Sequence, residues 1–417
     1  YTIKDQILGN GNLKLVVLAQ SKEEGLILKM EMENVDPASK IYAVYGGASG
    51  KTFSRNGDIG ADPESGFYLL PEYCEGNQFQ INKNQFELTY LNKKKENQYI
   101  NGSFSSTNSL QLADAKTLEK LSEFTQYKAE KSPIIYTTYS TQKNPVYIQI
   151  KKGKSEKNLS DEQLTSIFDE AEKSRLSLIN RVQLKTPDPD LNNFGATLAI
   201  AADGVWESPT FLHGAVAWRM RLNAWRGAYA ADVLSWHYRA KEHFESYSNS
   251  QVLKPDSAPV EMDTLLHLAR HKEKMGTSVF SSGYISRNPN DNSKPHHYDM
   301  NLVFFDQMFS HFNYTGDVDF LKKMWPTMVR HIDWEKRNFK RDGLYDAYAA
   351  IWASDALQYS GGKVTHTSAY NYRANREMAK LAKIIGEDST PYEKEAETIF
   401  KAMKNQLWIK SKRYFAE

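Results

Sequence analysis

The sequence contains a single cysteine, Cys74, among 417 residues. One thiol excludes an internal disulfide and any cysteine-rich metal site. Because no histidine lies near it in the sequence, we expect Cys74 to be structural rather than catalytic. Apolar residues never run for the about 18–20 positions that a membrane-spanning helix requires. The chain also lacks an excess of one charge, with 53 Lys and Arg against 51 Asp and Glu, which makes nucleic acid and anionic membranes poor candidates for partners.

Histidine and tryptophan are missing from the first part of the chain: all ten histidines and all eight tryptophans lie at or beyond Trp206. A chain of 417 residues exceeds the about 250–300 residues at which single cores stop growing. We therefore expect two domains of different chemistry, with the function in the second. The chain begins at Tyr1 without an apolar signal segment, which fits a processed or trimmed N-terminus.

Residues 1–157 have the pattern of a β domain. Alternating or β-branched runs at 13–18, 26–32 and 146–150 are separated by polar turns rich in Gly and Asn. We expect a β-sandwich, with a hairpin turning near Asn82–Asn84. Ser160-Asp-Glu-Gln163 forms a capping box ahead of apolar residues at helical spacing. This pattern predicts a linker helix over about 161–180, within a linker of residues 158–185.

Residues 186–417 form the predicted helical domain. Candidate helices lie at 191–205, 226–249, 260–275, 300–314, 317–339, 366–386 and 391–408. Gly276, Gly316 and Gly386 are placed to end helices, and Asp317 to begin one. Helix follows helix without a strand pattern or short repeat between them, so we expect a toroid of helical hairpins. These helices are too few for a closed double ring, and the residues after the last one resemble a loop that has only begun, so we expect a fragment of a larger protein.

The most informative chemistry lies in Trp206-Glu-Ser-Pro-Thr-Phe-Leu-His-Gly and in Ala224-Trp-Arg-Gly-Ala-Tyr. These segments combine aromatic rings for stacking, a carboxylate, and a guanidinium with five donors. That mixture is typical of a carbohydrate site. Further along the second segment, Tyr229 and Asp232 follow at a spacing that places them on one face of a helix.

These segments, together with Thr186-Pro-Asp-Pro-Asp-Leu-Asn after a linker helix, resemble the six-hairpin glycosidase superfamily. The resemblance implies a β-sandwich, a linker helix and an (α/α)6 barrel, in that order. The chain is most similar to a branch from polysaccharide-degrading Bacteroides-type bacteria, and more distantly to the inverting disaccharide phosphorylases. In the phosphorylases a Trp-x-Asp loop carries the general acid. Here Ile351-Trp-Ala-Ser-Asp355 matches that loop with one residue more between Trp and Asp.

The resemblance implies that Asp355 is the general acid, since Trp352 beside it could raise the pKa of the carboxyl and keep it protonated. Asp355 could instead cap backbone amides, and Asp346 is its nearest rival. Glu207 is the second catalytic candidate, with a helix-end role as its alternative. Cleavage of a glycosidic bond requires one carboxyl to protonate the leaving oxygen and a second group to handle the nucleophile.

We expect the substrate-binding residues to combine aromatic rings, imidazoles, carboxylates and one guanidinium. They are Trp206, His213, Trp225, Arg226, Tyr229, Asp232, His297, Asp299 and Trp352. Each also has a structural interpretation: His213 could pack in the core, Asp232 could form an ion pair between helices, and Asp299 could cap the helix that follows it. Arg226 would suit the carboxylate of a uronic acid or vicinal hydroxyls.

Asp263, His267 and His271 share one helical face but lack the His-Glu-x-x-His pattern, so we expect no metal, and no cofactor either. The leading hypothesis is an inverting glycoside hydrolase that cleaves oligosaccharides from plant or host glycans. The alternatives are a glycoside phosphorylase, a noncatalytic glycan-binding protein, and a polysaccharide lyase. The resemblance also implies a periplasmic or secreted protein of polysaccharide utilisation.

Overall fold

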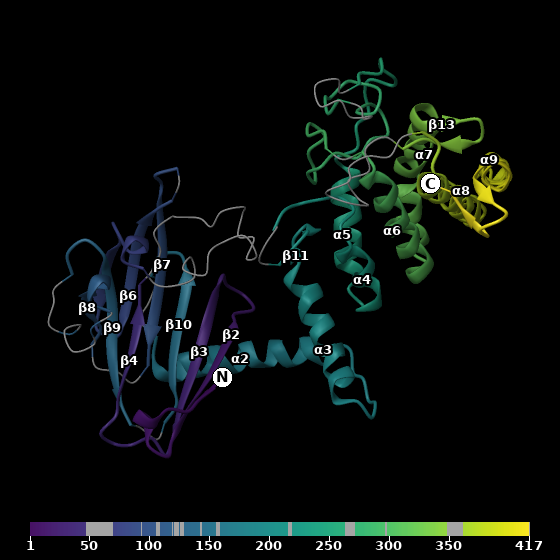
Figure 1. Ribbon diagram of the computed structural model, residues 1–417. Helices are drawn as coiled ribbons and strands as arrows, with labels where there is room; N and C mark the ends of the chain where they lie inside the picture. The colour runs from purple at the N-terminus through teal and green to yellow at the C-terminus, as the bar shows by residue number, and fades with distance from the viewer. Residues whose placement is uncertain are drawn as a thin grey trace. The chain divides into compact units, whose positions relative to one another are not determined.

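The chain folds into two compact units, Tyr1–Thr197 and Leu198–Glu417, shown as a computed structural model in Figure 1. The structure describes residues 1–46, 70–92, 94–105, 109–118, 120, 125, 129–141, 144–155, 159–215, 219–262, 272–296, 298–347 and 362–416. Among them, no helix is both long enough and apolar enough to cross a membrane.

The first unit is built on two antiparallel sheets. The larger sheet has the order β1-β2-β3-β10-β7-β6-β5 and the smaller one the order β4-β9-β8. Their strands are β1 (Thr2–Ile3), β2 (Asn12–Ala19), β3 (Gly25–Glu33), β4 (Lys40–Tyr45), β5 (Gln78–Asn82), β6 (Gln85–Leu91), β7 (Asn97–Phe104), β8 (Gln111–Asp114), β9 (Pro133–Ser140) and β10 (Val146–Lys152). The predicted runs at 13–18, 26–32 and 146–150 are β2, β3 and β10.

The two sheets share one apolar core, which makes the unit the expected β-sandwich. Phe86 and Leu88 of the larger sheet pack in the same cluster as Ile135 and Tyr139 of the smaller one. The alternation of inward apolar and outward polar residues along each strand produces this arrangement. The hairpin β5–β6 turns at Lys83, whose φ of 56° is in the left-handed region, as the sequence predicted.

The linker helix α2 (Asp161–Ile179) begins with the predicted capping box between Ser160 and Gln163. It packs on the larger sheet through Leu164, Phe168 and Ala171. Cys74 is buried, and burial raises the pKa of its thiol to about 11. The thiol therefore stays protonated near neutral pH, which supports a structural role.

The second unit is built on three helical hairpins (Figure 1). They are α4 (Gly227–Val233) with α5 (His237–Ser248), α6 (Met300–Thr315) with α7 (Val318–Phe339), and α8 (Thr365–Ile385) with α9 (Thr390–Ala402). Helix α3 (Pro189–Gly204) precedes them, and a π-helical turn at Met403–Leu407 follows α9. Short two-stranded hairpins are β11 (Trp206–Glu207) with β12 (Thr210–Phe211), β13 (Lys340–Arg341) with β14 (Leu344–Tyr345), and β15 (Trp408–Ile409) with β16 (Tyr414–Phe415).

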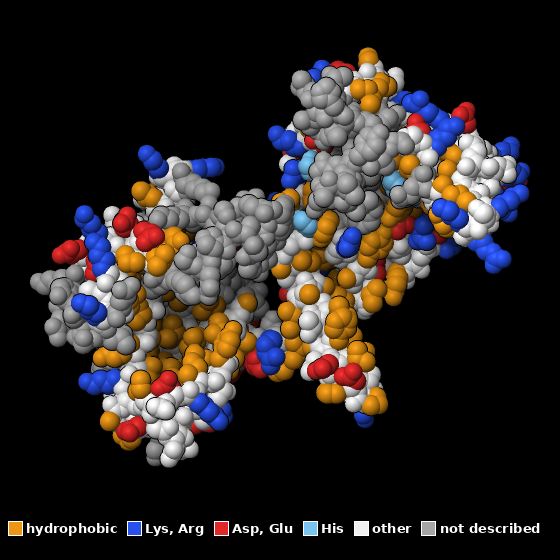
Figure 2. Space-filling model, in the orientation of Figure 1, with side chains coloured by type: hydrophobic (Ala, Val, Ile, Leu, Met, Phe, Trp, Pro, Cys, Tyr) orange, Lys and Arg blue, Asp and Glu red, His pale blue; other side chains and the backbone are white. Residues whose placement is uncertain are grey.

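The hairpin turns confirm several predicted helix ends. Gly316 and Gly386 occupy the left-handed conformation just after α6 and α8, and Asp317 accepts a hydrogen bond from the Phe320 amide at the start of α7. A sandwich followed by helical hairpins is the expected fold class. On the face that Figure 2 shows, Lys and Arg side chains gather at the edge formed by α8 and α9, whereas the sandwich carries both signs of charge.

Two helix predictions need correction. The segment 226–249 is two helices rather than one, because the chain reverses at Leu234–Trp236, where Ser235 has a φ of 58°. Of the predicted helix 260–275, residues 263–271 lie outside the described part of the chain, and the described residues on either side are not helical. Gly276, with a φ of 82°, therefore follows a non-helical segment instead of ending a helix.

Candidate active site at the N-terminal ends of α4, α6 and α8

Helices α4, α6 and α8 run parallel to one another. Tyr229 and Asp232 of α4 bond to Asp306 and His311 of α6, so residue numbers rise together along the two helices. In the same way Asp306 and Asn313 of α6 pair with Arg373 and Lys380 of α8. The three helices therefore begin at the same end of the unit, and the long segments 205–226, 249–299 and 340–364 lead into that end.

Glu207 lies in the first of these segments, where two arginines share its carboxylate. Arg219 Nη2 donates to Oε2 at 2.9 Å, and Arg221 Nη2 donates to Oε1 at 3.0 Å. The preceding ring, Trp206, packs on Phe211 with centroids 4.8 Å apart, and the Arg239 guanidinium lies 5.5 Å from the Trp206 ring. Both oxygens of Glu207 therefore accept charge-assisted hydrogen bonds from guanidinium groups.

The predicted residues His213, Trp225 and Arg226 lie together. The His213 and Trp225 rings meet edge to face with centroids 3.7 Å apart, and the Arg226 guanidinium lies 5.6 Å from the Trp225 ring. Gln307 of α6 donates to the Trp225 carbonyl at 3.0 Å, which fixes the start of α4 against α6. Arg226 is the residue directly before α4, and it is exposed.

His243 of α5 holds two segments of this end together, although the sequence did not single it out. The Phe211 amide donates to His243 Nδ1 at 3.3 Å, so the ring proton is on Nε2, which donates to the Asn223 carbonyl at 3.2 Å. Complete burial lowers the pKa of His243 to about 3, which keeps the imidazole neutral and this bonding pattern intact.

Tyr229 belongs to a polar cluster of three helices. Its hydroxyl donates to Asp306 Oδ2 of α6 at 2.5 Å, and Arg373 of α8 forms an ion pair with the same carboxylate. Burial and the Asp306 carboxylate raise the pKa of the Tyr229 phenol well above its usual range. Asp306 and Arg373 were not predicted. The available signal was an acidic residue, Asp306, within the mainly apolar run Leu302–Phe309.

Asp232 lies at the far end of α4, where it joins two histidines. Its carboxylate is 2.8 Å from His311 Nδ1 of α6 and 2.8 Å from His237 Nδ1 of α5. Asp232 is buried, with a relative exposure of 6%. Asp232 therefore joins helices, as its structural interpretation predicted. It lies one to two helical turns away from Arg226, which is at the end of the unit where α4, α6 and α8 begin.

Asp299 is buried directly before α6, and its side chain makes no capping hydrogen bond to that helix, contrary to the capping interpretation. His297, Trp352 and Asp355 lie outside the described residues.

The rival acid Asp346 lies in the same connecting segment as Asp355. Burial raises the pKa of the Asp346 carboxyl, against the lowering effect of Arg341, whose Nε is 2.6 Å away. A raised pKa is what a general acid requires.

A pocket of about 470 Å³ opens at this end of the unit. It is lined by Glu207, Leu212, Arg219, Arg221, Arg287, Asn288, Lys294 and Pro295, and we call it the cationic pocket. Its lining comes from two of the long segments that lead into α4 and α6. The candidate catalytic residue Glu207 is therefore next to a space that a ligand could enter.

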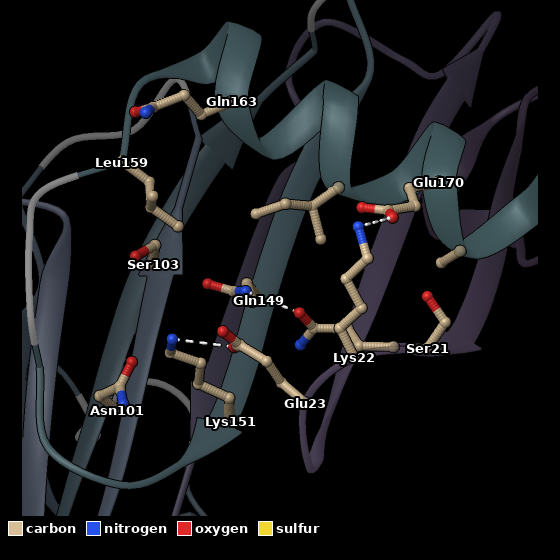
Figure 3. A pocket seen from close by; sticks show the side chains of 13 residues that line it. Ser21, Lys22, Glu23, Asn101, Ser103, Gln149, Lys151, Leu159, Gln163 and Glu170 are labelled. Carbon is tan, nitrogen blue, oxygen red and sulfur yellow. Dashed lines mark hydrogen bonds and ion pairs between the residues drawn. The ribbon is translucent and has the colours of Figure 1, made fainter.

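A second pocket, of about 310 Å³, lies in the first unit between the larger sheet and α2 (Figure 3). Asn101, Ser103 and Gln149 form its polar floor, and Gln149 donates to Gln20 at 2.9 Å. Each of its two lysines has an acidic partner, Lys22 with Glu170 and Lys151 with Glu23. This pocket is therefore polar but balanced in charge.

The residues that the structure describes hold no group of three or more His, Cys, Asp and Glu side chains suited to a metal ion. Asp263, His267 and His271 are outside those residues.

Two protein families match parts of the chain. Residues 1–172 match a domain of unknown function, DUF4450. Residues 294–417 match the bacterial α-L-rhamnosidase six-hairpin glycosidase domain. No curated protein sequence matches the chain.

Among solved structures, a bacterial glucoamylase in complex with acarbose is similar over 97% of this chain and 56% of its own, with 13% identity and a TM-score of 0.53. The chain thus spans little more than half of that structure, and the likeness shows a shared fold. A rhamnosidase of family GH78 from Bacillus sp. GL1 covers 96% of this chain and 34% of its own, with 11% identity and a TM-score of 0.42. Residues 294–417 therefore match a six-hairpin glycosidase domain, and the chain shares its fold with the glucoamylase, in agreement with the resemblance seen in the sequence.

Proposed function

We propose that this chain is the sugar-binding and catalytic part of a glycoside hydrolase that releases sugars from oligosaccharides of plant or host glycans. The observation that carries the proposal is the convergence at one end of α4, α6 and α8. The segments that precede these parallel helices carry Glu207, Trp225 and Arg226, and one of them leads to Asp355. Carboxylates beside aromatic rings are what glycosidic bond cleavage requires.

The proposed mechanism is inverting. Asp355, kept protonated, donates a proton to the leaving glycosidic oxygen, while a second carboxylate removes a proton from the water that attacks the anomeric carbon from the opposite face. Glu207 is the candidate for the second role, because its carboxylate lines the cationic pocket and forms ion pairs with Arg219 and Arg221. Asp346 is the alternative acid, since burial raises the pKa of its carboxyl.

The remaining predicted residues would bind the sugar. Trp206, Trp225 and Trp352 would stack on ring faces, and His213, Arg226, Tyr229, His297 and Asp299 would bond to hydroxyls. An α-L-rhamnoside is a reasonable first substrate because of the family that residues 294–417 match. We further propose a division into a β-sandwich domain (1–157), a linker (158–185) and a barrel domain (186–417), in a periplasmic or secreted protein of polysaccharide utilisation.

Substitution of the two candidate acids tests the mechanism. In the natural full-length protein, Asp355→Asn should lower kcat by about two to four orders of magnitude, the usual contribution of a general acid, while oligosaccharide binding measured by calorimetry stays within a few-fold. Asp346→Asn should leave kcat within a few-fold. The reverse pattern would assign the acid to Asp346, and full activity in both variants would remove both residues from the mechanism.

A glycoside phosphorylase is the second candidate, favoured by the cationic pocket beside Glu207. There, inorganic phosphate would replace water as the nucleophile. Product release that depends on phosphate and yields a sugar phosphate would establish this activity. Saturable oligosaccharide binding without any product would instead indicate a glycan-binding protein.

A further inference from the structure

The cationic pocket has more positive side chains than its carboxylate can balance. Arg219, Arg221, Arg287 and Lys294 line it, against the single carboxylate of Glu207. Glu207 bonds to Arg219 and Arg221, one oxygen each. Within the described part of the chain, no carboxylate forms an ion pair with Arg287 or Lys294. Both are therefore available to an anionic ligand.

Hydrogen bonds hold the backbone of the segments that carry these cations. Arg287 and Lys294 lie on facing sides of a tight loop, in which the Arg287 amide donates to the Lys294 carbonyl at 3.2 Å. The Ser286 hydroxyl donates to the same carbonyl at 2.7 Å. On the other wall, Leu212 and Arg221 form an antiparallel bridge. A site fixed in this way loses little entropy on binding.

The pocket of the first unit also has a polar lining, but both of its lysines are paired. In that pocket Lys22 and Lys151 each lie against a glutamate (Figure 3). The surplus of positive charge is thus a local property of the end of the helical unit where α4 and α6 begin.

We propose that the cationic pocket binds the carboxylate of a uronic-acid residue, so that the glycan recognised by this protein is acidic. This inference rests on the proposed function and specifies its substrate class. Arg287 and Lys294 bind the carboxylate, and Asn288 is placed to bond to neighbouring hydroxyls. A guanidinium can bind a carboxylate through two parallel N–H···O bonds.

The size of the pocket favours a sugar carboxylate over free phosphate. Its volume of about 470 Å³ is in the range of ligand pockets that hold whole small molecules, so it has room for a sugar ring. A carboxylate carried on a ring with hydroxyl groups therefore fills the lining better than free phosphate.

The test is calorimetric titration of the natural full-length protein with glucuronate- and galacturonate-containing disaccharides, and with the neutral disaccharides in which glucose or galactose replaces the uronic acid. Arg287→Gln and Lys294→Gln remove one positive charge each from the pocket. Arg376→Gln and Lys322→Gln are the matched controls, because both side chains are exposed and neither lines the pocket. Unchanged circular dichroism and Tm would show that each variant is folded.

We expect at least one uronate disaccharide to bind about tenfold or more tightly than its neutral counterpart. Arg287→Gln and Lys294→Gln should each remove most of that preference, the controls none of it, and added salt should weaken it. Equal affinity for acidic and neutral disaccharides would overturn the inference but leave the glycosidase proposal standing. Binding of inorganic phosphate or a sulfated sugar alone, in the same titration, would also overturn the inference. Absence of binding to every saccharide would contradict both proposals.

Discussion

Glu335 of α7 is an ionisable side chain buried inside the helical unit. It is fully enclosed between α7 and α8, where the Asn371 amide donates to its Oε2 at 3.0 Å. Burial raises the pKa of Glu335 to about 8, against the lowering effect of this hydrogen bond. The carboxyl is therefore neutral in the folded protein through most of the physiological pH range.

This burial predicts a pH-dependent stability. In the unfolded chain a Glu ionises near pH about 4.3, whereas the folded protein keeps the proton of Glu335 up to a pKa of about 8. Between these values the folded state binds one more proton, so the free energy of unfolding falls as pH rises, by about 1.4 kcal/mol per pH unit at most. Glu335→Gln should flatten this dependence in Tm measurements at pH 5, 6.5 and 8.

The exposed Glu397 of α9 supplies the control, because its carboxylate pairs only at the surface with Lys401. Glu397→Gln should retain the full slope of Tm with pH. A slope of the same size in Glu335→Gln would show that another group causes it.

Asp232 offers a second prediction at this scale. Because it bonds to the buried His311 and to His237, we expect Asp232→Ala to lower the free energy of unfolding by about 3 kcal/mol. His237 is far more exposed than His311, so His237→Ala should cost less than about 1 kcal/mol. A normal Tm in Asp232→Ala together with a raised KM would instead support the substrate-binding role.

At the level of residues, the sequence indicated the segments that carry the candidate site. It did not indicate the residues on other helices that bond to those segments. Glu207, Trp225 and Arg226 stand out because aromatic, acidic and basic groups are adjacent in the chain. The sequence does not single out Asp306, Arg373 and His243, because each of them bonds to residues that are distant in the chain. The cations of the pocket were likewise missed, since Arg219 and Arg287 are separated by 68 positions in the numbering.

Among the elements, the irregular segment 249–299 forms part of the end of the helical unit at which α4, α6 and α8 begin. Gly283 is its tightest point: its φ is +101°, and an added Cβ would lie 2.4 Å from both the Arg330 carbonyl oxygen and Trp334 Cβ. Only a residue without a side chain fits against α7 here. The loop that carries Arg287 and Lys294 follows four residues later.

Gly283→Ala should therefore destabilise the protein by about 3 kcal/mol or more, through both backbone strain and overlap with α7. Gly276→Ala separates the two effects, because Gly276 also has a positive φ, +82°, but no atom within 4 Å of an added Cβ. It should cost about 1 kcal/mol. Equal losses in chemical denaturation of the two variants would show that contact with α7 is unimportant.

The elements themselves were largely predictable. Strong periodicity and end signals located α2, α6, α7 and α8 to within a few residues, and the alternating runs located β2, β3 and β10. The division of 226–249 was not predictable, because its apolar spacing continues across the reversal at Ser235. That reversal is set by tertiary contacts, including the burial of Trp236, rather than by a glycine or proline.

At the scale of the whole molecule, the chain consists of two compact units with separate cores. We expect two transitions in differential scanning calorimetry rather than one. Leu88→Ala, in the core of the sandwich, should lower only one transition, and Met328→Ala, in the core of the helical unit, only the other, each by about 2–5 kcal/mol of unfolding free energy. A single transition that both substitutions shift equally would show that the units unfold together.

The order of the units was predicted from the distribution of histidine and tryptophan and from the change in periodicity, and the fold class of the helical unit from its helical spacing. The arrangement of the three parallel helices was not predictable, because it depends on pairs such as Tyr229 with Asp306 and Asp306 with Arg373. That arrangement places the candidate site at one end of the unit.

The most direct test of the central claim is product release by the natural full-length protein from a panel of rhamnosyl, neutral and uronic-acid oligosaccharides, with and without phosphate. The account predicts release of a free sugar from at least one acidic substrate without phosphate, and loss of that release in Asp355→Asn. Release of nothing from any member of the panel, with no saccharide bound, would contradict it.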